Sequence, residues 1–343
     1  MPVRNAAPGT IPFFMPRGMP CAPANTPSTR PWQDALAANA WRMPAHTECR
    51  GIPAPWTIAS PRACGPFPLP PPSVFLSLRR PPPPESQWRY AFVQRTDRGL
   101  VRTNNEDAVH AEAGAAWSLA VLADGMGGYQ AGEVASALAV QCVVRSLQHS
   151  AAQPAPSSVP ARMAAVHRAL EQCVQKANTA VRAHAARHPE CEGMGTTVVA
   201  AVFTQDRLVV AHLGDSRAYL WRRGTLRQLT TDHSWLQELI DAGHISVEAA
   251  AQSGQGHLIT RALGVSARAQ PTLHEEPLEA GDRVLLCSDG LSDMLGAAEI
   301  AALLALPQPL SLQADQLIAQ ANARGGHDNI SVIIAAVEPA PAD

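Results

Sequence analysis

The sequence has no long hydrophobic run and no strong imbalance of charge. Its longest unbroken run of apolar residues is Ile300 to Leu306, whereas a membrane-spanning helix needs about 20 such residues. The chain carries 27 basic and 29 acidic residues, for a formal net charge of -2. This near balance argues against a polybasic protein that binds nucleic acid or a membrane surface. We therefore expect no nucleic-acid partner and no membrane insertion.

Cysteine is also scarce, and its spacing is irregular. The seven cysteines lie at positions 21, 49, 64, 142, 173, 191 and 287, and no CxxC pair occurs. An odd and scattered set argues against a disulfide framework and against a structural zinc site, and a reducing cytosol fits it best. Hydrophobic residues make up 46% of the chain, which is enough for a large core. We expect a cytoplasmic protein.

Proline is concentrated at the N-terminal end. Of the 31 prolines, 21 lie in residues 1–84, where eight arginines and two acidic residues give a net charge of +6, against -8 for the remainder. Proline at this density fixes φ and removes backbone donors, so neither helix nor sheet can propagate. We predict that residues 1–86 are a disordered extension: an interaction tail, a segment without function, or the product of a start codon assigned too far upstream. Residues 87–338 are predicted to form one domain, followed by a short tail at 339–343.

The domain is predicted to contain both strands and helices. Strand patterns cover residues 88–94, 117–123, 196–203, 207–213, 217–221, 226–229, 283–287 and 330–337. Helical patterns cover residues 132–148, 161–188, 234–242 and 312–324. Because strands follow one another in groups, with helices between the groups, the order favours an α+β fold of antiparallel sheets covered by helices.

Acidic residues stand at the ends of several predicted strands. Asp124 follows an apolar strand and precedes a glycine-rich turn, Asp215 and Asp289 follow two further strands, and Asp328 lies just before the last one. One Asp-Gly pair is usually only a turn, but four such aspartates in one domain predict carboxylates that converge. Converging carboxylates repel one another, and cations that prefer oxygen ligands, Mg²⁺ or Mn²⁺, relieve the repulsion.

Taken together, these motifs resemble those of the metal-dependent protein phosphatase family, the type 2C serine/threonine phosphatases, in its bacterial form. The matching stretches occur in the family's order: residues 96–107, 123–128, 193–197, 214–219, 229–234, 259–264, 288–293 and 328–332. None of them lies in residues 1–86. The resemblance implies a four-layer αββα sandwich of two antiparallel sheets flanked by helices, with a metal site in a cleft at one end.

The resemblance also implies a set of metal ligands. Asp124 would bridge two divalent cations, Mn²⁺ or Mg²⁺, and the carbonyl oxygen of Gly125 would bind one of them. Asp289 and Asp328 would complete the other site. Asp215, together with Asp289, matches the positions that hold a third metal ion in bacterial members.

Other residues would act beside the metal ions. By the same resemblance, Glu106 would lie near the second metal, directly or through water, and Asp107 would orient the ligands. Arg102 would bind the substrate phosphate. Met126 stands where many eukaryotic members have a histidine that acts as general acid, so the source of the leaving group's proton stays unassigned.

Three further residues receive structural predictions. His233 lies in residues 231–264, which match the mobile flap of the family, and we interpret it as a hydrogen-bonding strut. Arg217 is expected to support the neighbouring acidic loop. Cys287, inside an apolar strand, is expected to be a core residue rather than a redox-active thiol.

These features predict a phosphatase that hydrolyses phosphoserine and phosphothreonine by direct attack of a metal-bridging water or hydroxide. We expect a monomer that acts on phosphoproteins, including a cognate serine/threonine kinase. Two alternatives stay open: a catalytically inactive phosphatase fold that serves as a binding or signalling module, and a two-metal hydrolase of a small phosphorylated molecule. A nucleic-acid substrate is not expected, because the acidic domain would repel phosphate backbones.

Overall fold

The computed structural model describes residues 88–128, 131–246, 249–250 and 258–340. All of them belong to the second of the two units into which the chain divides, Met1–Ser77 and Leu78–Asp343. The predicted extension at residues 1–86 and the last three residues of the predicted tail lie outside the described residues. The domain boundary at residue 86 therefore stays a prediction.

Two antiparallel sheets form the centre of the described part of the chain. The first has the order β1 (Trp88–Asp97), β11 (Ile330–Pro339), β10 (Arg283–Cys287), β7 (Arg217–Arg222) and β8 (Thr225–Gln228). The second has the order β2 (Asp107–Glu112), β3 (Ser118–Met126), β5 (Val198–Phe203), β6 (Arg207–Leu213) and β9 (Thr272–Pro277), and β4 (Gly195–Thr196) pairs with β3.

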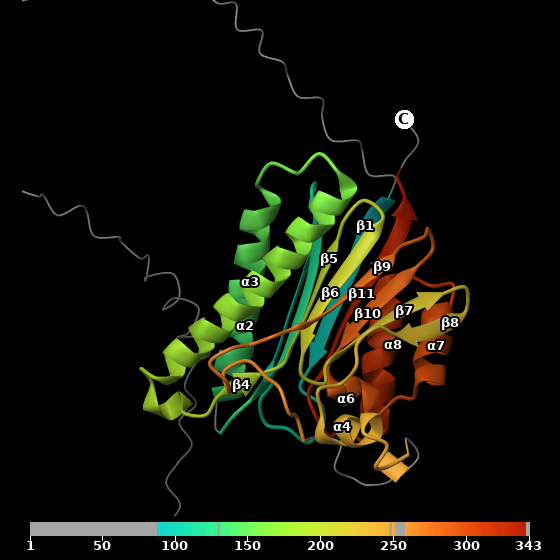
Figure 1. Ribbon diagram of the computed structural model, residues 1–343. Coiled ribbons are helices and arrows are strands. Elements are labelled where there is room, and N and C mark those ends of the chain that lie inside the picture. Colours follow the sequence, from blue (N-terminus) through green and yellow to red (C-terminus); the bar gives the residue numbers. More distant parts are fainter. Residues whose placement is uncertain (1–87, 129–130, 247–248, 251–257, 341–343) are drawn as a thin grey trace, which may run out of the picture. The chain divides into compact units, whose positions relative to one another are not determined.

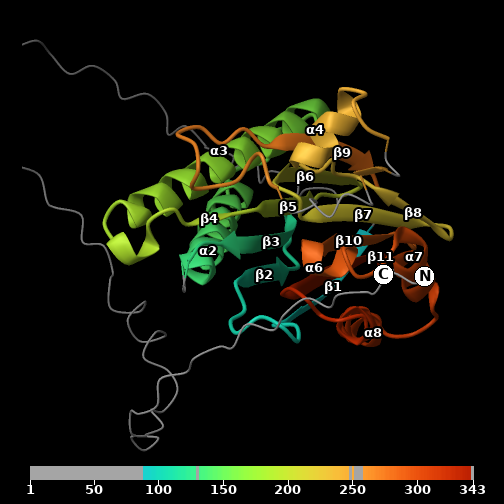
Figure 2. The ribbon, with the colours of Figure 1, turned by 90° about the horizontal axis from the view of Figure 1, so that it is seen from below.

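Helices cover the outer face of each sheet (Figures 1 and 2). The second sheet is covered by α2 (Ala131–Ala151) and α3 (Val159–Ala185), and the first by α6 (Asp289–Ser292), α7 (Ala297–Ala305) and α8 (Leu310–Ala323). The short helices η1 (Pro189–Cys191) and α4 (Trp235–Asp241) lie in connections. This is the predicted four-layer αββα arrangement, and the prediction is confirmed. None of the helices in the described ranges combines the length and the apolar character that a membrane crossing requires.

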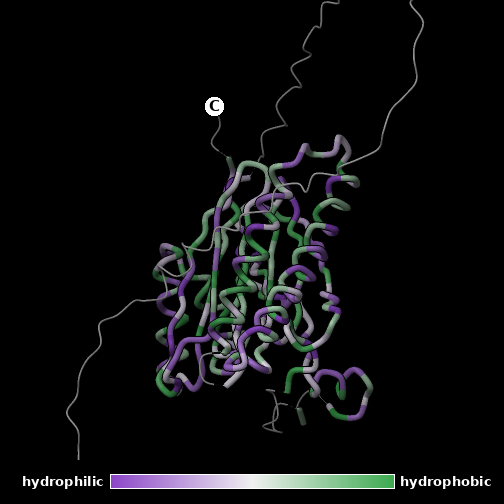
Figure 3. The backbone as a smooth tube through the Cα atoms, turned by 90° about the vertical axis from the view of Figure 1, so that its left-hand side faces the viewer, coloured by the Kyte–Doolittle hydropathy of each residue, from purple (hydrophilic) through white to green (hydrophobic). Residues whose placement is uncertain are grey.

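Three hydrophobic cores hold the layers together, because the central strands are buried on both faces. On β3, Val121 packs among α2 and α3 residues, whereas its neighbour Leu122 packs against the first sheet. On β11, Ile333 packs between the sheets and Ile334 packs beneath α7 and α8. Burial on both faces explains why these strands appear in the sequence as continuous apolar runs. Figure 3 shows hydrophobic and hydrophilic residues alternating along the covering helices instead.

The structure corrects the predicted elements in two respects. It contains β2, β9 and α7, which the sequence patterns did not indicate. Strands β2 and β9 are at most half-buried along their lengths, so neither has the apolar signature of a core strand. In addition, β3 continues to Met126, because Gly125 pairs with Thr196 of β4. Asp124 is therefore a strand residue, not the residue that follows a strand.

Candidate functional site

The predicted aspartates come from one strand and three segments beside strands, at one end of the two sheets, the lower end in Figure 1. Asp124 lies near the end of β3, and Asp215 follows β6 by two residues. Asp289 opens α6 directly after β10, and Asp328 precedes β11 by two residues. Because β10 and β11 are antiparallel neighbours, the end of one and the start of the other bring Asp289 and Asp328 to the same edge.

The carboxylate of Asp124 lies at the centre of this group. Burial raises its pKa well above the ordinary value, and the carboxylates of Asp107, Asp289, Asp215 and Asp328 raise it further, in that order. Each of these four groups is thus close enough to oppose a negative charge on Asp124. The structure brings together the aspartates that the sequence analysis selected from separate motifs.

Asp107 is held directly opposite Asp124, since the two residues are register partners in the β2–β3 pair. The hydroxyl of Ser288 donates to Asp107 Oδ2 at 2.8 Å, while Asp107 Oδ1 is buried and has no hydrogen-bond partner among the described residues. Burial is the main reason that the pKa of Asp107 rises to about 7, and the hydrogen bonds from Ser331 and Ser288 oppose the rise. This geometry fits a residue that orients the acidic group from its inner side.

The carboxylate of Asp215 lies in surroundings similar to those of Asp107. Its side chain is buried, and its Oδ1 finds no hydrogen-bond partner within the described ranges. Burial, followed by the charges of Asp289 and Asp232, raises its pKa to about 7. A buried carboxylate without a partner is strongly unfavourable as an anion. Divalent cations with oxygen ligands are the groups that would offset the negative charge around Asp107 and Asp215.

Arg102 lies next to the acidic group. Its Nη2 is 2.6 Å from Asp328 Oδ2, and the two side chains are 52% and 28% exposed. Burial by itself would lower the pKa of Arg102, but the charges of Asp328, Glu106 and Asp124 outweigh this effect and raise it. Burial raises the pKa of Glu106, and Arg102 opposes this rise. One arginine thus borders the carboxylates on the side that solvent can reach.

Close backbone packing fixes Gly125. A Cβ atom at Gly125 would lie 2.1 Å from the carbonyl oxygen of Gly132 and 2.7 Å from that of Glu106. A Cβ atom at Gly132 would lie 2.5 Å from Glu106 Oε2. The amide of Gly125 also donates to the Glu106 carbonyl at 3.0 Å. Two glycines therefore let the first turn of α2, the end of β3 and Glu106 meet without a side chain between them.

Asn329 is a positioning residue to which the sequence analysis gave no role. Its Nδ2 donates to the carbonyls of Arg98 and Asn104, both at 2.9 Å, and its Oδ1 accepts from the amide of Glu106 at 2.7 Å. The side chain is 4% exposed. One amide thus fixes both sides of the loop that carries Arg102. The available signal was its place in the motif, directly after Asp328.

Replacing Asn329 with alanine should weaken both the fold and the site. Three partly buried hydrogen bonds of about 1 kcal/mol each are lost, so we expect the free energy of unfolding to fall by roughly 2–4 kcal/mol. The freed loop should also raise the Mn²⁺ concentration that half-saturates the protein. Urea denaturation and Mn²⁺ titration test this, with Gln153→Ala as the control for loss of an exposed amide. An Asn329→Ala protein as stable as the control would contradict the assignment.

His233 has the structural role that the sequence analysis gave it. Its Nδ1 accepts from the amide of Gly214 at 3.2 Å, so Nε2 carries the proton and donates to Thr272 Oγ1 at 3.0 Å. Its ring stacks on that of His212, with centroids 4.5 Å apart. Burial, with smaller effects of His212 and Arg261, lowers the pKa of His233 to about 4. The ring is a neutral strut between β9 and the turn that precedes Asp215.

Arg217 and Cys287 also lie in structural surroundings. Nε and Nη2 of Arg217 donate to the carboxylate of Asp232 at 2.9 and 2.6 Å, which joins β7 to the segment that follows β8. Cys287 is fully buried in the core beneath α6–α8. Burial raises the pKa of its thiol to about 12, so the reactive thiolate is disfavoured.

The donor set fits divalent cations. Carboxylates and a backbone carbonyl are the ligands that Mg²⁺ and Mn²⁺ prefer. In the described part of the chain, no three Asp, Glu, His or Cys side chains are drawn tightly enough together to enclose an ion by themselves. This agrees with the mutual repulsion seen at Asp124 and with the pairing of Asp328 to Arg102. The fit rests on the unsatisfied oxygens of Asp107 and Asp215.

Comparison with known proteins decides the family. A family model described as Protein phosphatase 2C matches residues 101–321. The chain belongs to the protein phosphatase 2C family. It is 44% identical over 246 residues to the serine/threonine protein phosphatase PstP of Mycobacterium tuberculosis, a match that covers 72% of this chain and 45% of that protein. It is 37% identical to the serine/threonine phosphatase stp of Listeria innocua, with 70% and 93% covered.

Solved structures of the family agree in fold. The crystal structure of PstP from Mycobacterium tuberculosis superposes with a TM-score of 0.63 at 42% identity, over 73% of this chain and 99% of that one. The PstP catalytic domain in complex with two manganese ions gives 0.62 at 41% identity, with the same coverage. Stp1 from Staphylococcus aureus gives 0.64 at 34% identity, over 72% and 94%. The resemblance inferred from the motifs is confirmed.

Proposed function

We propose that this chain is a metal-dependent phosphatase that hydrolyses phosphoserine and phosphothreonine in proteins. The observation that carries the proposal is the group of carboxylates around Asp124, with its unsatisfied buried oxygens, bordered by Arg102. A cluster of this kind has no stable role in a metal-free interior. Its curated relatives PstP and stp are named serine/threonine phosphatases.

Most of these residues would bind metal ions. Asp124, the carbonyl of Gly125, Asp289 and Asp328 would hold two divalent cations, and Asp215 with Asp289 would hold a third. When bound, Mn²⁺ or Mg²⁺ would neutralise the carboxylates, withdraw charge from the phosphoryl oxygens and lower the pKa of a water molecule. The two manganese ions of the PstP complex support this choice of metal.

Glu106 and Asp107 would act next to the residues that bind the metal ions. Asp107, fixed by the hydroxyl of Ser288 at 2.8 Å, would keep its second oxygen available to the metal site. Glu106, whose amide and carbonyl are both held in place, would lie near the second cation. Both roles depend on backbone geometry that Asn329 and Gly125 maintain.

Arg102 would bind the substrate phosphate. A guanidinium has a planar fork of donors that matches two phosphoryl oxygens. Its ion pair with Asp328 lies at the surface, and exposed pairs contribute only about 0–1 kcal/mol. Exchange of the Asp328 oxygen for a phosphate oxygen therefore costs little, especially once a cation binds Asp328.

We further propose that the protein is a cytoplasmic monomer and that its substrates include a cognate serine/threonine kinase. The substrates of a phosphoserine and phosphothreonine hydrolase must be produced by such a kinase, and autophosphorylated kinases are themselves phosphoproteins. Size-exclusion chromatography with light scattering tests the monomer. Dephosphorylation of a purified kinase tests the substrate.

The decisive experiment for the activity uses the full chain with a phosphothreonine peptide, p-nitrophenyl phosphate and a small phosphorylated metabolite. Each is incubated with Mn²⁺, Mg²⁺ or EDTA, and an Asp289→Asn variant is assayed in parallel. We expect metal-dependent release of phosphate from the peptide that EDTA and the substitution abolish. Hydrolysis of the metabolite alone would indicate the small-molecule hydrolase. A folded, metal-binding protein without turnover would indicate the binding module.

A further inference from the structure

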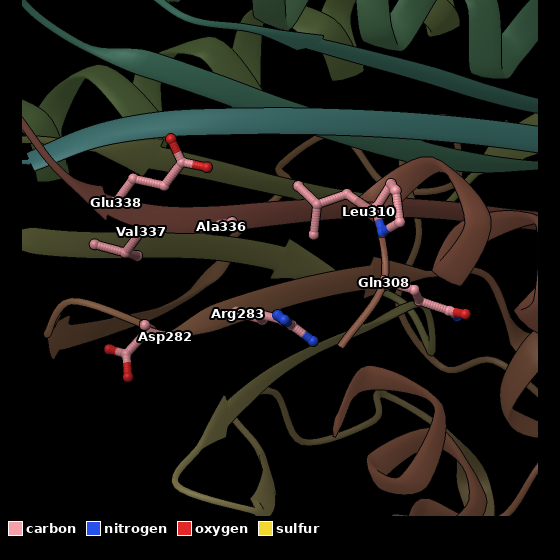
Figure 4. Close-up of a pocket in the computed structure, with 9 residues that line it drawn as sticks. Asp282, Arg283, Gln308, Leu310, Ala336, Val337 and Glu338 are labelled. Carbon is pink, nitrogen blue, oxygen red and sulfur yellow. The ribbon is translucent and has the colours of Figure 1, made fainter. Parts of the chain in front are cut away.

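A second site candidate lies at the opposite end of the first sheet from the acidic residues. A cavity of about 320 Å³ lies there between the start of β10, the end of β11 and the N-terminus of α8 (Figure 4). Strand β11 begins two residues after Asp328 and reaches this cavity with Ala336, Val337 and Glu338. The length of a ten-residue strand therefore separates the cavity from the proposed active site.

Arg283 is the cation of this cavity. It is the first residue of β10, with Trp221 and Ala336 as its cross-strand partners. It lies on the same face as Leu285 and Cys287, which pack beneath α7 and α8. Its Cζ lies 5.2 Å from the centroid of the Trp221 ring. Figure 4 shows the guanidinium extending toward Gln308 and Leu310, away from the carboxylates of Asp282 and Glu338.

One nitrogen of the Arg283 guanidinium lacks an acceptor among the described residues. Its Nη1 is buried and has no hydrogen-bond partner in the described part of the chain. Burial lowers the pKa of Arg283, and no described carboxylate acts to raise it. Stacking on Trp221 satisfies the face of the guanidinium but gives Nη1 no acceptor for its N–H donors. A buried donor without an acceptor is unfavourable, and more so when it is charged.

The acidic residues at the cavity are already paired with other cations. The carboxylate of Asp282 accepts from Arg222 Nε at 2.8 Å and from Nη2 at 2.6 Å. Glu338 is 3.4 Å from Arg89 Nη2 on the surface. Neither is the counter-ion of Arg283. Apart from Gln308, the remaining lining is apolar, and Leu310 and Ala336, the cross-strand partner of Arg283, lie on the same face of the sheet as the cation.

We propose that this cavity binds a carboxylate that carries a short aliphatic group, with the carboxylate on Arg283. A planar carboxylate matches the guanidinium fork, and the aliphatic group would contact Leu310 and Ala336. A single negative charge suits the place better than the double charge of a phosphate, because Asp282 and Glu338 stand at the same cavity. The volume is at the small end of ligand pockets. The proposal does not depend on the phosphatase activity.

The test measures binding to the full chain by calorimetry, with isovalerate as the probe, and isovaleramide and methyl phosphate as comparisons. We expect isovalerate to bind with a Kd of roughly 1 mM, as is reasonable for a ligand of so few atoms, and to raise the unfolding temperature. The uncharged amide should bind at least about tenfold more weakly. No detectable binding of isovalerate, or tighter binding of methyl phosphate, would overturn the proposal. These comparisons use the wild-type chain and need no variant.

Two variants and a peptide sharpen the result. Arg283→Gln should weaken isovalerate binding at least about tenfold, whereas Arg223→Gln, which removes an exposed cation of the turn between β7 and β8, should leave it unchanged. Equal binding by both variants would overturn the assignment. A hexapeptide that ends in valine and its C-terminal amide identify the source of the carboxylate. Tighter binding of the peptide acid indicates a protein C-terminus, and tighter binding of isovalerate indicates a free small acid.

Discussion

Asparagine in place of Asp124 should remove almost all phosphatase activity and, in EDTA, should make the protein more stable than the wild type. Asp124 is the carboxylate on which burial and four other carboxylates act, so its charge opposes folding when no cation is bound. The amide has the same shape without the charge. We expect the free energy of unfolding in EDTA to rise by on the order of 1 kcal/mol at pH 8. The loss of this proposed metal ligand should lower kcat at least roughly 10³-fold.

A gain in stability together with a loss of activity distinguishes this result from misfolding, which would lower both. Urea denaturation in EDTA gives the stability, and hydrolysis of a phosphothreonine peptide with saturating Mn²⁺ gives the rate. Asp315→Asn is the matched control, because Asp315 is an exposed carboxylate on α8 that pairs with Arg95. The control should change both quantities little. An Asp124→Asn protein that is less stable in EDTA, or within tenfold of the wild-type rate, would contradict the central place given to Asp124.

The central strands could be predicted because their burial on both faces requires a nearly continuous apolar run, which is visible in the local sequence. The apolar runs at 283–287 and 330–337 are hydrophobic on both faces, which corresponds to a strand between two cores. Strands β2 and β9 lie at sheet edges and mix histidine, glutamate and threonine with apolar residues. Their pairing depends on neighbours that are distant in sequence. No local pattern could therefore have indicated them.

The same distinction applies to the candidate site. The aspartates proposed as metal ligands stand within or beside strands and next to small residues, so motif and chemistry together predict them. Asn329 and Ser288 hold groups more than 180 residues away in sequence, and their roles exist only in the folded chain. Arg283 is a further case. In the sequence it is an ordinary polar residue at the start of a strand, and only packing reveals that its Nη1 lacks an acceptor among the described residues.

Mn²⁺ should stabilise the protein far more at pH 8 than at pH 5. In the metal-free protein the pKa of Asp107 and of Asp215 is about 7, against about 4 in an unfolded chain. Their contribution to stability is complete below pH 4 and is lost as the pH rises through 7, because the native state must then hold unpaired charges. Cation binding requires the deprotonated carboxylates, so it offsets this loss at pH 8 and competes with protons at pH 5.

At pH 8 and a Mn²⁺ concentration of 100 Kd, the stabilisation should be about 2.7 kcal/mol, and at pH 5 a small fraction of this.

His233 should produce a separate loss of stability at acid pH. Its pKa of about 4 lies below the unfolded value, so its contribution is present above pH 6.5 and is lost as the pH falls toward 4. Because His233 bonds to Gly214 and Thr272, Mn²⁺ should leave this acid limb unchanged. Thermal unfolding from pH 4 to 9, with Mn²⁺ and with EDTA, measures both limbs. Equal stabilisation by Mn²⁺ at pH 5 and pH 8 would show that protons and the cation do not compete for the carboxylates around Asp124.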